Sequence, residues 1–128
     1  MKRRKFISNS LILGSTAAVF PNIVIGQKEE QKKVRLGFIG VGLRGQSHLE
    51  MAMYRSDVDV IAICDIDPKA IDIALKMISD KSRSAPAVYG KTEKDFENLA
   101  KRNDIDGVVI ATPWEWHVPM ALEVMKQG

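Results

Sequence analysis

Glycine is concentrated at one point of the chain, residues 40–45, which read GVGLRG. The hexapeptide matches G-x-G-x-x-G, the spacing with which three glycines cradle the pyrophosphate of a dinucleotide. The first glycine permits a tight turn, the second lets the backbone approach the pyrophosphate, and the third lets a helix pack closely on a sheet. An apolar run precedes the motif and a helical pattern follows it, which is the context the motif requires. A glycine-rich turn without a ligand is the alternative interpretation.

A carboxylate stands where such a site needs one. Asp65 follows the apolar run 58–64 and comes 20 residues after Gly45. An acidic side chain at the end of the second strand accepts hydrogen bonds from the hydroxyls of the adenosine ribose. Its charge would repel the 2′-phosphate of NADP, so the sequence favours NAD as the cofactor. A surface aspartate that only ends a strand is the alternative.

A third group of candidates occupies residues 112–117, which read TPWEWH. We expect this segment to be a loop at the carboxyl end of the fourth strand, the edge where open parallel sheets bind ligands. Two tryptophans and a histidine within four residues favour contact with the cofactor. In the alternative, both indoles pack beneath another domain and His117 only caps the following helix.

These candidates need elements to position them. Short apolar runs predict buried parallel strands, and helical spacing predicts helices between them. Such alternation predicts an α/β fold of Rossmann type, a parallel sheet of about four strands with helices on both faces and right-handed crossovers. The predicted strands are 34–39, 58–64, 87–89 and 107–111, and helices are expected over 46–55, from the N-cap Asp67 onward, after 92 and over 119–126.

The number of strands bears on the domain organisation. A doubly wound nucleotide domain commonly has six strands, and the pattern here supplies four. We therefore expect residues 34–128 to be the N-terminal part of a Rossmann dinucleotide-binding domain, with the substrate domain absent from this chain.

Residues 1–26 differ in composition from the rest. Four basic residues at positions 2–5 precede an apolar stretch over 11–25, and the segment has no Asp or Glu. This composition is typical of an export signal. The apolar stretch is too short, and too often interrupted by polar residues, glycine and proline, to span a membrane. Arg3 and Arg4 begin a pattern that resembles the twin-arginine signal. We expect export to a bacterial periplasm by the twin-arginine machinery, without stable membrane insertion after processing. An ordinary secretory signal is the alternative. Residues 27–33 are expected to form a polar linker.

The charge balance argues against a nucleic-acid partner. The chain has 19 Lys and Arg against 16 Asp and Glu, and four of the basic residues lie in the leader, which leaves 15 against 16 and a net charge of −1 for residues 27–128. The body therefore has no global excess of positive charge to attract a phosphate backbone. Cys64 is the only cysteine, which excludes a disulfide framework and a multi-cysteine metal site. We expect no bound metal and an inert, buried Cys64.

Residues 34–45, 64–68 and 111–117 together resemble the Gfo/Idh/MocA oxidoreductase family. The glycine loop combined with residues 112–117 is similar to its glycoside hydrolase family 109 subgroup, whose type activity is NAD-dependent α-N-acetylgalactosaminidase. Trp114 stands where the wider family commonly has Asn, a departure toward the hydrolase subgroup. The family's catalytic residues have no counterpart before residue 128, so no catalytic residue is assigned. The predicted cofactor-binding residues are Gly40, Gly42, Leu43, Arg44, Gly45, Asp65, Trp114, Glu115, Trp116 and His117.

The resemblance implies a carbohydrate substrate and a redox cycle closed within the enzyme. NAD would oxidise a sugar ring carbon, the ketone would acidify the neighbouring C–H, and elimination and water addition would precede return of the hydride. An exported enzyme finds little free NAD, which favours such a redox-neutral reaction. The alternatives are an NAD-dependent sugar or polyol oxidoreductase and an inactive nucleotide-binding fragment. The sugar, the linkage and the oligomeric state stay open.

Overall fold

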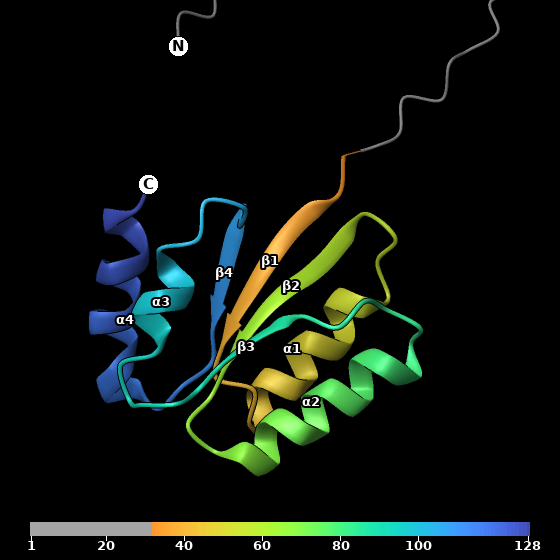
Figure 1. The fold of residues 1–128 in the computed structure, drawn as a ribbon, viewed down its shortest axis with the longest axis horizontal. Helices are drawn as coiled ribbons and strands as arrows, with labels where there is room; N and C mark the ends of the chain where they lie inside the picture. The colour runs from red at the N-terminus through yellow and green to blue at the C-terminus, as the bar shows by residue number, and fades with distance from the viewer. Residues whose placement is uncertain (1–31) are drawn as a thin grey trace, which may run out of the picture.

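The computed structural model describes residues 32–128, so the predicted export leader and most of the predicted linker lie outside the described residues. In the described part, four strands alternate with four helices (Figure 1). The strands are β1 (Val34–Ile39), β2 (Val58–Cys64), β3 (Ala87–Tyr89) and β4 (Gly107–Ile110), and the helices are α1 (Leu43–Met53), α2 (Pro68–Asp80), α3 (Phe96–Ala100) and α4 (Trp114–Lys126).

All four strands are parallel and lie in the order β3-β2-β1-β4. The chain builds outward from β1 to β3 and then crosses to the other side of β1 to form β4. This order brings the carboxyl ends of β2, β1 and β4 together at one edge, which is how the first half of a Rossmann fold is arranged. The predicted α/β fold of Rossmann type is confirmed.

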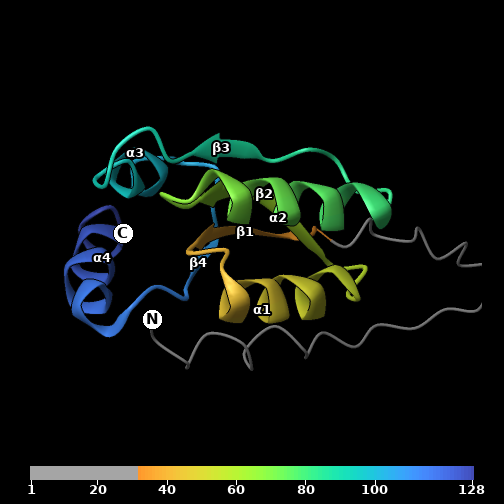
Figure 2. The ribbon, with the colours of Figure 1, turned by 90° about the horizontal axis from the view of Figure 1, so that it is seen from below.

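Helices cover both faces of the sheet (Figure 1). Figure 2 shows α3 and α4 side by side, away from α1 and α2. Successive side chains of a strand point to opposite faces, so neighbours in the sequence enter different cores. Phe38 and Ile63 pack in the core beneath α1 and α2, whereas Ile39 and Cys64 pack in the core beneath α3 and α4.

Cys64 is part of this packing and takes no part in polar chemistry. Its side chain is buried, and burial, reinforced by the nearby carboxylates of Asp95 and Asp65, raises the pKa of its thiol to about 12. The thiol therefore stays protonated at neutral pH and is a poor nucleophile. This agrees with the expectation of an inert core cysteine.

Two helices begin earlier than the sequence pattern predicted. α1 begins at Leu43 rather than at residue 46, because Gly42 of the glycine loop is itself the N-cap. α4 begins at Trp114 rather than at residue 119, with Pro113 as its N-cap and Pro119 inside the helix. The prediction took Pro119 as a helix start, where proline is common. Residues 114–117 therefore form the first turn of α4, not a loop.

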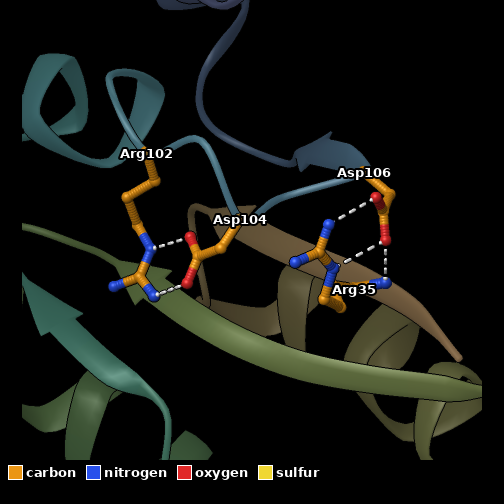
Figure 3. Close-up of polar contacts among 4 residues, drawn as sticks. All are labelled: Arg35, Arg102, Asp104 and Asp106. Carbon is orange, nitrogen blue, oxygen red and sulfur yellow. Dashed lines mark hydrogen bonds and ion pairs between the residues drawn. The ribbon is translucent and has the colours of Figure 1, made fainter.

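At the opposite end of the sheet, an ion pair joins β1 to the residue before β4 (Figure 3). Arg35 donates from Nη2 and Nε to the two carboxylate oxygens of Asp106 at 2.9 and 3.0 Å, and from its backbone N–H at 2.9 Å. These hydrogen bonds lower the pKa of Asp106 well below its usual range. A second pair, Arg102 with Asp104, holds the loop that leads from α3 into β4.

Replacing Asp106 by Asn should lower the melting temperature at neutral pH, because it removes the charge that Arg35 holds in place. The pKa of Asp106 is lower in the folded than in the unfolded state, so its stabilisation is complete above the unfolded value of about 3.9 and is lost as the pH falls through the folded value. The difference in melting temperature between the wild type and Asp106→Asn should stay constant from neutral pH to about pH 5 and shrink in stronger acid. Circular dichroism during heating measures it, with Asp72→Asn, an exposed site on α2, as the control. An equal loss in both variants would contradict the assignment.

Candidate cofactor-binding site

The loops at the carboxyl ends of β1, β2 and β4 surround a pocket of about 210 Å³. Among the predicted site residues, Gly40, Gly42, Asp65 and Trp116 line it. The others, namely Leu43, Arg44, Gly45, Trp114, Glu115 and His117, do not line it. Ligand pockets commonly enclose about 300–1,000 Å³, so this one has room for part of a dinucleotide, with the remainder lying along the open edge of the sheet.

Two of the three motif glycines are required by contacts inside the protein. Gly40 has φ +88°, and a Cβ there would lie 2.7 Å from the carbonyl carbon of Ala111. A Cβ on Gly45 would lie 2.1 Å from the carbonyl oxygen of Gly40. Neither space can hold a side chain, because the obstructing atoms belong to the backbone. The close approach of α1 to the end of β1 therefore depends on these glycines.

Gly42 is different, since the protein itself gives no reason for a glycine there. Its φ of −70° and ψ of −161° are open to any residue, and a Cβ would meet nothing within 4 Å. The space beside Gly42 is the space that a pyrophosphate needs to approach the backbone. No side chain caps α1 at Gly42, so the N–H groups of its first turn are available to an anion. The glycine loop thus fits a dinucleotide.

Asp65 ties the glycine loop to the end of β2. Its Oδ2 accepts a hydrogen bond from the Val41 N–H at 2.8 Å, and its Oδ1 accepts one from the Asp67 N–H at 2.9 Å. A carboxylate offers about four lone-pair positions, so each oxygen keeps capacity for one further donor. Asp65 can therefore hold the loop and accept from two ribose hydroxyls at the same time. It is not merely an aspartate that ends a strand.

The two tryptophans at the start of α4 have different surroundings. Trp116 lines the pocket and packs edge-on against Phe96, with ring centroids 6.3 Å apart and an interplanar angle of 69°. Trp114 is 90% exposed. Positions two apart on a helix are rotated by about 200° from each other, so both indoles cannot face the pocket. Only Trp116 is placed as a pocket residue.

His117 spans the turn between β4 and α4. Its Nε2 lies 2.6 Å from the carbonyl oxygen of Thr112, and because a carbonyl only accepts, the ring nitrogen donates. The neutral tautomer protonated at Nε2 and the imidazolium both supply this proton. Thr112 and Pro113 line the pocket, whereas His117 does not. In this structure the imidazole positions the pocket wall.

The segment between β3 and α3 also contributes to the site, and the sequence analysis missed it. Asp95 is 7% exposed and accepts hydrogen bonds from the backbone N–H groups of Gly90 at 2.6 Å and Lys91 at 2.9 Å and from the Asn98 side chain at 2.8 Å. The Asn98 bond and the two backbone bonds lower the pKa of Asp95. This buried carboxylate fixes the path of the loop, and Glu93 lines the pocket from it.

Gly90 explains how that loop comes so close to Asp65. Its φ is +155°, and a Cβ there would lie 2.0 Å from the carbonyl oxygen of Asp65. The Asp65 N–H also donates to the Tyr89 carbonyl oxygen at 3.2 Å. A glycine directly after a predicted strand was the available signal, but only the pairing of β3 with β2 gives it meaning.

Two further hollows lie elsewhere on the surface. One of about 260 Å³ is lined by Val58 and Arg83, and one of about 300 Å³ by Ile105 and Gly107. Val58 and Gly107 begin their strands, so both hollows lie toward the amino ends. Parallel sheets bind ligands at the carboxyl ends, which favours the pocket at the glycine loop. Among residues 32–128 there is no group of three potential metal ligands, and no helix is long and apolar enough to cross a bilayer.

Fold and pocket together define the first half of a dinucleotide-binding Rossmann domain. Residues 34–128 match the model of the Gfo/Idh/MocA oxidoreductase family, described as an NAD-binding Rossmann fold, and the chain belongs to this family. The cofactor of this domain is NAD, as the glycine loop and Asp65 predicted.

Several curated proteins that are similar to this chain carry the name glycosyl hydrolase family 109. The chain is 44% identical over 100 residues to a glycosyl hydrolase family 109 protein of Saccharopolyspora erythraea, an alignment that covers 78% of this chain and 22% of that protein. It is 39% identical over 127 residues to glycosyl hydrolase family 109 protein 1 of Shewanella sp. (strain MR-4), with 94% and 28% covered. The chain thus spans about a quarter of the length of these relatives.

Solved structures share the fold. The myo-inositol dehydrogenase of Lactobacillus casei, in complex with NAD(H) and myo-inositol, is 27% identical with a TM-score of 0.60, and the match covers 73% of this chain and 26% of that one. The scyllo-inositol dehydrogenase of the same species, with bound NAD(H) and scyllo-inositol, has a TM-score of 0.62 at 21% identity, with 76% and 26% covered. The second likeness speaks for the fold alone.

Alanine substitutions at Gly42 and Gly45 should separate cofactor binding from folding. Gly45→Ala should destabilise the chain by about 1–3 kcal/mol, because its Cβ meets the Gly40 carbonyl oxygen. Gly42→Ala should keep or slightly raise stability but weaken NAD binding on the order of tenfold, or about 1.4 kcal/mol. Denaturant unfolding measures stability, and calorimetric titration of the full-length protein measures NAD affinity. Unchanged NAD affinity in Gly42→Ala would contradict the placement of the pyrophosphate.

Proposed function

We propose that the full-length protein is an NAD-dependent glycosidase of the family 109 type, which acts on a carbohydrate by transient oxidation of the sugar. The observation that carries the proposal is the identity of 39–47% to proteins named glycosyl hydrolase family 109. It is supported by residues 114–117. Trp114 stands where the wider family commonly has Asn, and Trp116, two residues later, gives the pocket an indole from α4. The bound NAD supplies reversible hydride transfer.

The chain's own residues would hold the cofactor as follows. The first-turn N–H groups of α1, from Leu43 to Gly45, are offered to the pyrophosphate beside Gly42. Asp65 accepts from the ribose hydroxyls while it anchors the loop. Trp116 closes the β4 side of the pocket. Leu43, Arg44, Trp114, Glu115 and His117 remain proposed contacts, and they would meet the cofactor outside the enclosed part of the pocket.

An NAD-dependent sugar or polyol oxidoreductase is the second candidate. It is favoured by the likeness to the myo-inositol dehydrogenase of Lactobacillus casei, which is 27% identical to this chain with a TM-score of 0.60. The two candidates differ in the fate of the hydride. The glycosidase returns it to the sugar, and the oxidoreductase leaves it on the cofactor.

We also propose that residues 1–26 direct export of the folded protein through the twin-arginine machinery. The match to the Shewanella relative covers 94% of this chain, more than residues 34–128 alone account for, and therefore reaches into the leader. Folded export lets NAD be loaded in the cytoplasm and carried out inside the protein. A redox-neutral reaction then needs no external supply of NAD.

The full-length protein, purified with its bound cofactor, should release the aglycone from an aryl α-N-acetylgalactosaminide over many turnovers without added NAD⁺. No NADH should accumulate at the nicotinamide absorbance band, about 340 nm, because each hydride returns to the sugar. Solvent deuterium should enter the sugar carbon beside the transient ketone. Stoichiometric NADH with an intact glycosidic bond would overturn the glycosidase and leave the oxidoreductase.

The leader fused to a folded fluorescent reporter should carry it out of the cytoplasm, and the double substitution Arg3→Lys with Arg4→Lys should stop it. Cell fractionation measures the distribution of the reporter. Lys2→Arg with Lys5→Arg is the matched control, since it keeps the charge and the paired arginines. Undiminished export of the Arg3→Lys, Arg4→Lys variant would indicate the general secretory route instead.

A further inference from the structure

The charges that face the cofactor pocket are all negative. Asp65 and Glu93 are the acidic residues among those that line it, the Cys64 thiol stays protonated, and neither Lys nor Arg lines it. The two carboxylates come from different elements, Asp65 from the end of β2 and Glu93 from the loop between β3 and α3. The pocket therefore carries a formal charge of −2 before the cofactor enters.

Glu93 differs from Asp65 in how its charge is used. Both oxygens of Asp65 accept backbone hydrogen bonds, one from Val41 in the glycine loop and one from Asp67. The Glu93 side chain is exposed and takes part in none of the hydrogen bonds or ion pairs found within residues 32–128. Lys91 and Lys94 are its neighbours in the sequence, but they do not line the pocket. Glu93 thus brings to the pocket a charge that no partner within residues 32–128 neutralises.

The backbone that carries Glu93 is fixed close to the ribose end of the site. The buried Asp95 holds the N–H groups of Gly90 and Lys91, and Gly90 packs directly on the carbonyl oxygen of Asp65. Asp65 is where the adenosine ribose hydroxyls are expected. A 2′-phosphate on that ribose would enter the region that these two carboxylates bound.

We propose that Glu93 is a second determinant of cofactor selection, which acts with Asp65 to exclude NADP by repelling its 2′-phosphate. Glu93 acts through its charge and makes no contact that NAD needs. Because Asp65 also anchors the glycine loop, its replacement changes loop position and cofactor choice together. Glu93 is the site where selection can be altered without that structural change. The proposal concerns cofactor binding and holds for a glycosidase and for an oxidoreductase alike.

The test compares Glu93→Gln and Glu93→Lys in the full-length protein, stripped of cofactor and titrated calorimetrically with NAD⁺ and with NADP⁺ at low ionic strength. NADP⁺ affinity should rise about threefold to tenfold in Glu93→Gln and further in Glu93→Lys, while NAD⁺ affinity changes by less than about twofold. The gain should shrink at about 0.5 M salt, because the interaction is screened. Melting temperatures show whether each variant is folded.

Two further variants distinguish charge at this position from general effects. Glu93→Asp keeps the charge and should keep the preference for NAD⁺. Glu50→Gln removes one charge from an exposed position on α1 outside the pocket and should leave the preference unchanged. Equal changes for both cofactors, no change in Glu93→Gln and Glu93→Lys, or the same gain in Glu50→Gln would each overturn the proposal. Loss of glycosidase activity with the expected cofactor shift would leave it standing.

Discussion

The carbonyl oxygen of Gly40 occupies the space that a side chain at residue 45 would fill, only 2.1 Å from the position of its Cβ. This contact lets α1 begin immediately after β1, and so directs the first-turn N–H groups of the helix toward the carboxyl edge of the sheet. The same helix buries Leu49 and Met53 against the sheet, so its position is set at both ends. A larger residue at position 45 would lift the helix from the sheet and displace the anion site with it.

Asp65 couples this helix start to the neighbouring strand. The hydrogen bond from the Val41 N–H fixes the glycine loop relative to β2, and the spare capacity of the carboxylate faces the ligand. The side chain that fixes the loop is therefore also the one proposed to accept from the ribose hydroxyls. Binding of NAD would stabilise the loop as well as the folded chain, since a ligand that binds only the folded state shifts the equilibrium toward it. The buried Asp95 holds the loop after β3 through backbone hydrogen bonds, as Asp65 holds the glycine loop after β1.

The fold alone does not decide the reaction, because relatives named glycosyl hydrolases and inositol dehydrogenases share this half-domain. The residues that resemble the hydrolase subgroup include those at the start of α4. There Trp116 lines the pocket and Trp114 is exposed, so the two indoles lie on different sides of the helix. His117 stabilises this turn through the Thr112 carbonyl.

The sequence by itself determined the order of strands and helices along the chain, the bounds of β1, β2 and β3, and the meeting of the glycine loop and Asp65 at the carboxyl edge of the sheet. These are local features, since apolar runs, glycine spacing and an acidic residue after a strand act through neighbours in the chain. The predicted start of α4 was wrong because two prolines, Pro113 and Pro119, each suit the beginning of a helix. The structure has the earlier start, after Pro113, and there Trp116 packs against Phe96. Only the tertiary structure decided that Gly42, alone among the three glycines of the motif, has open space where a Cβ would lie, that His117 donates to Thr112, and that Gly90, Glu93 and Asp95 belong to the site. The place of Gly90, Glu93 and Asp95 beside Asp65 depends on the pairing of β3 with β2, a long-range contact that no local pattern encodes.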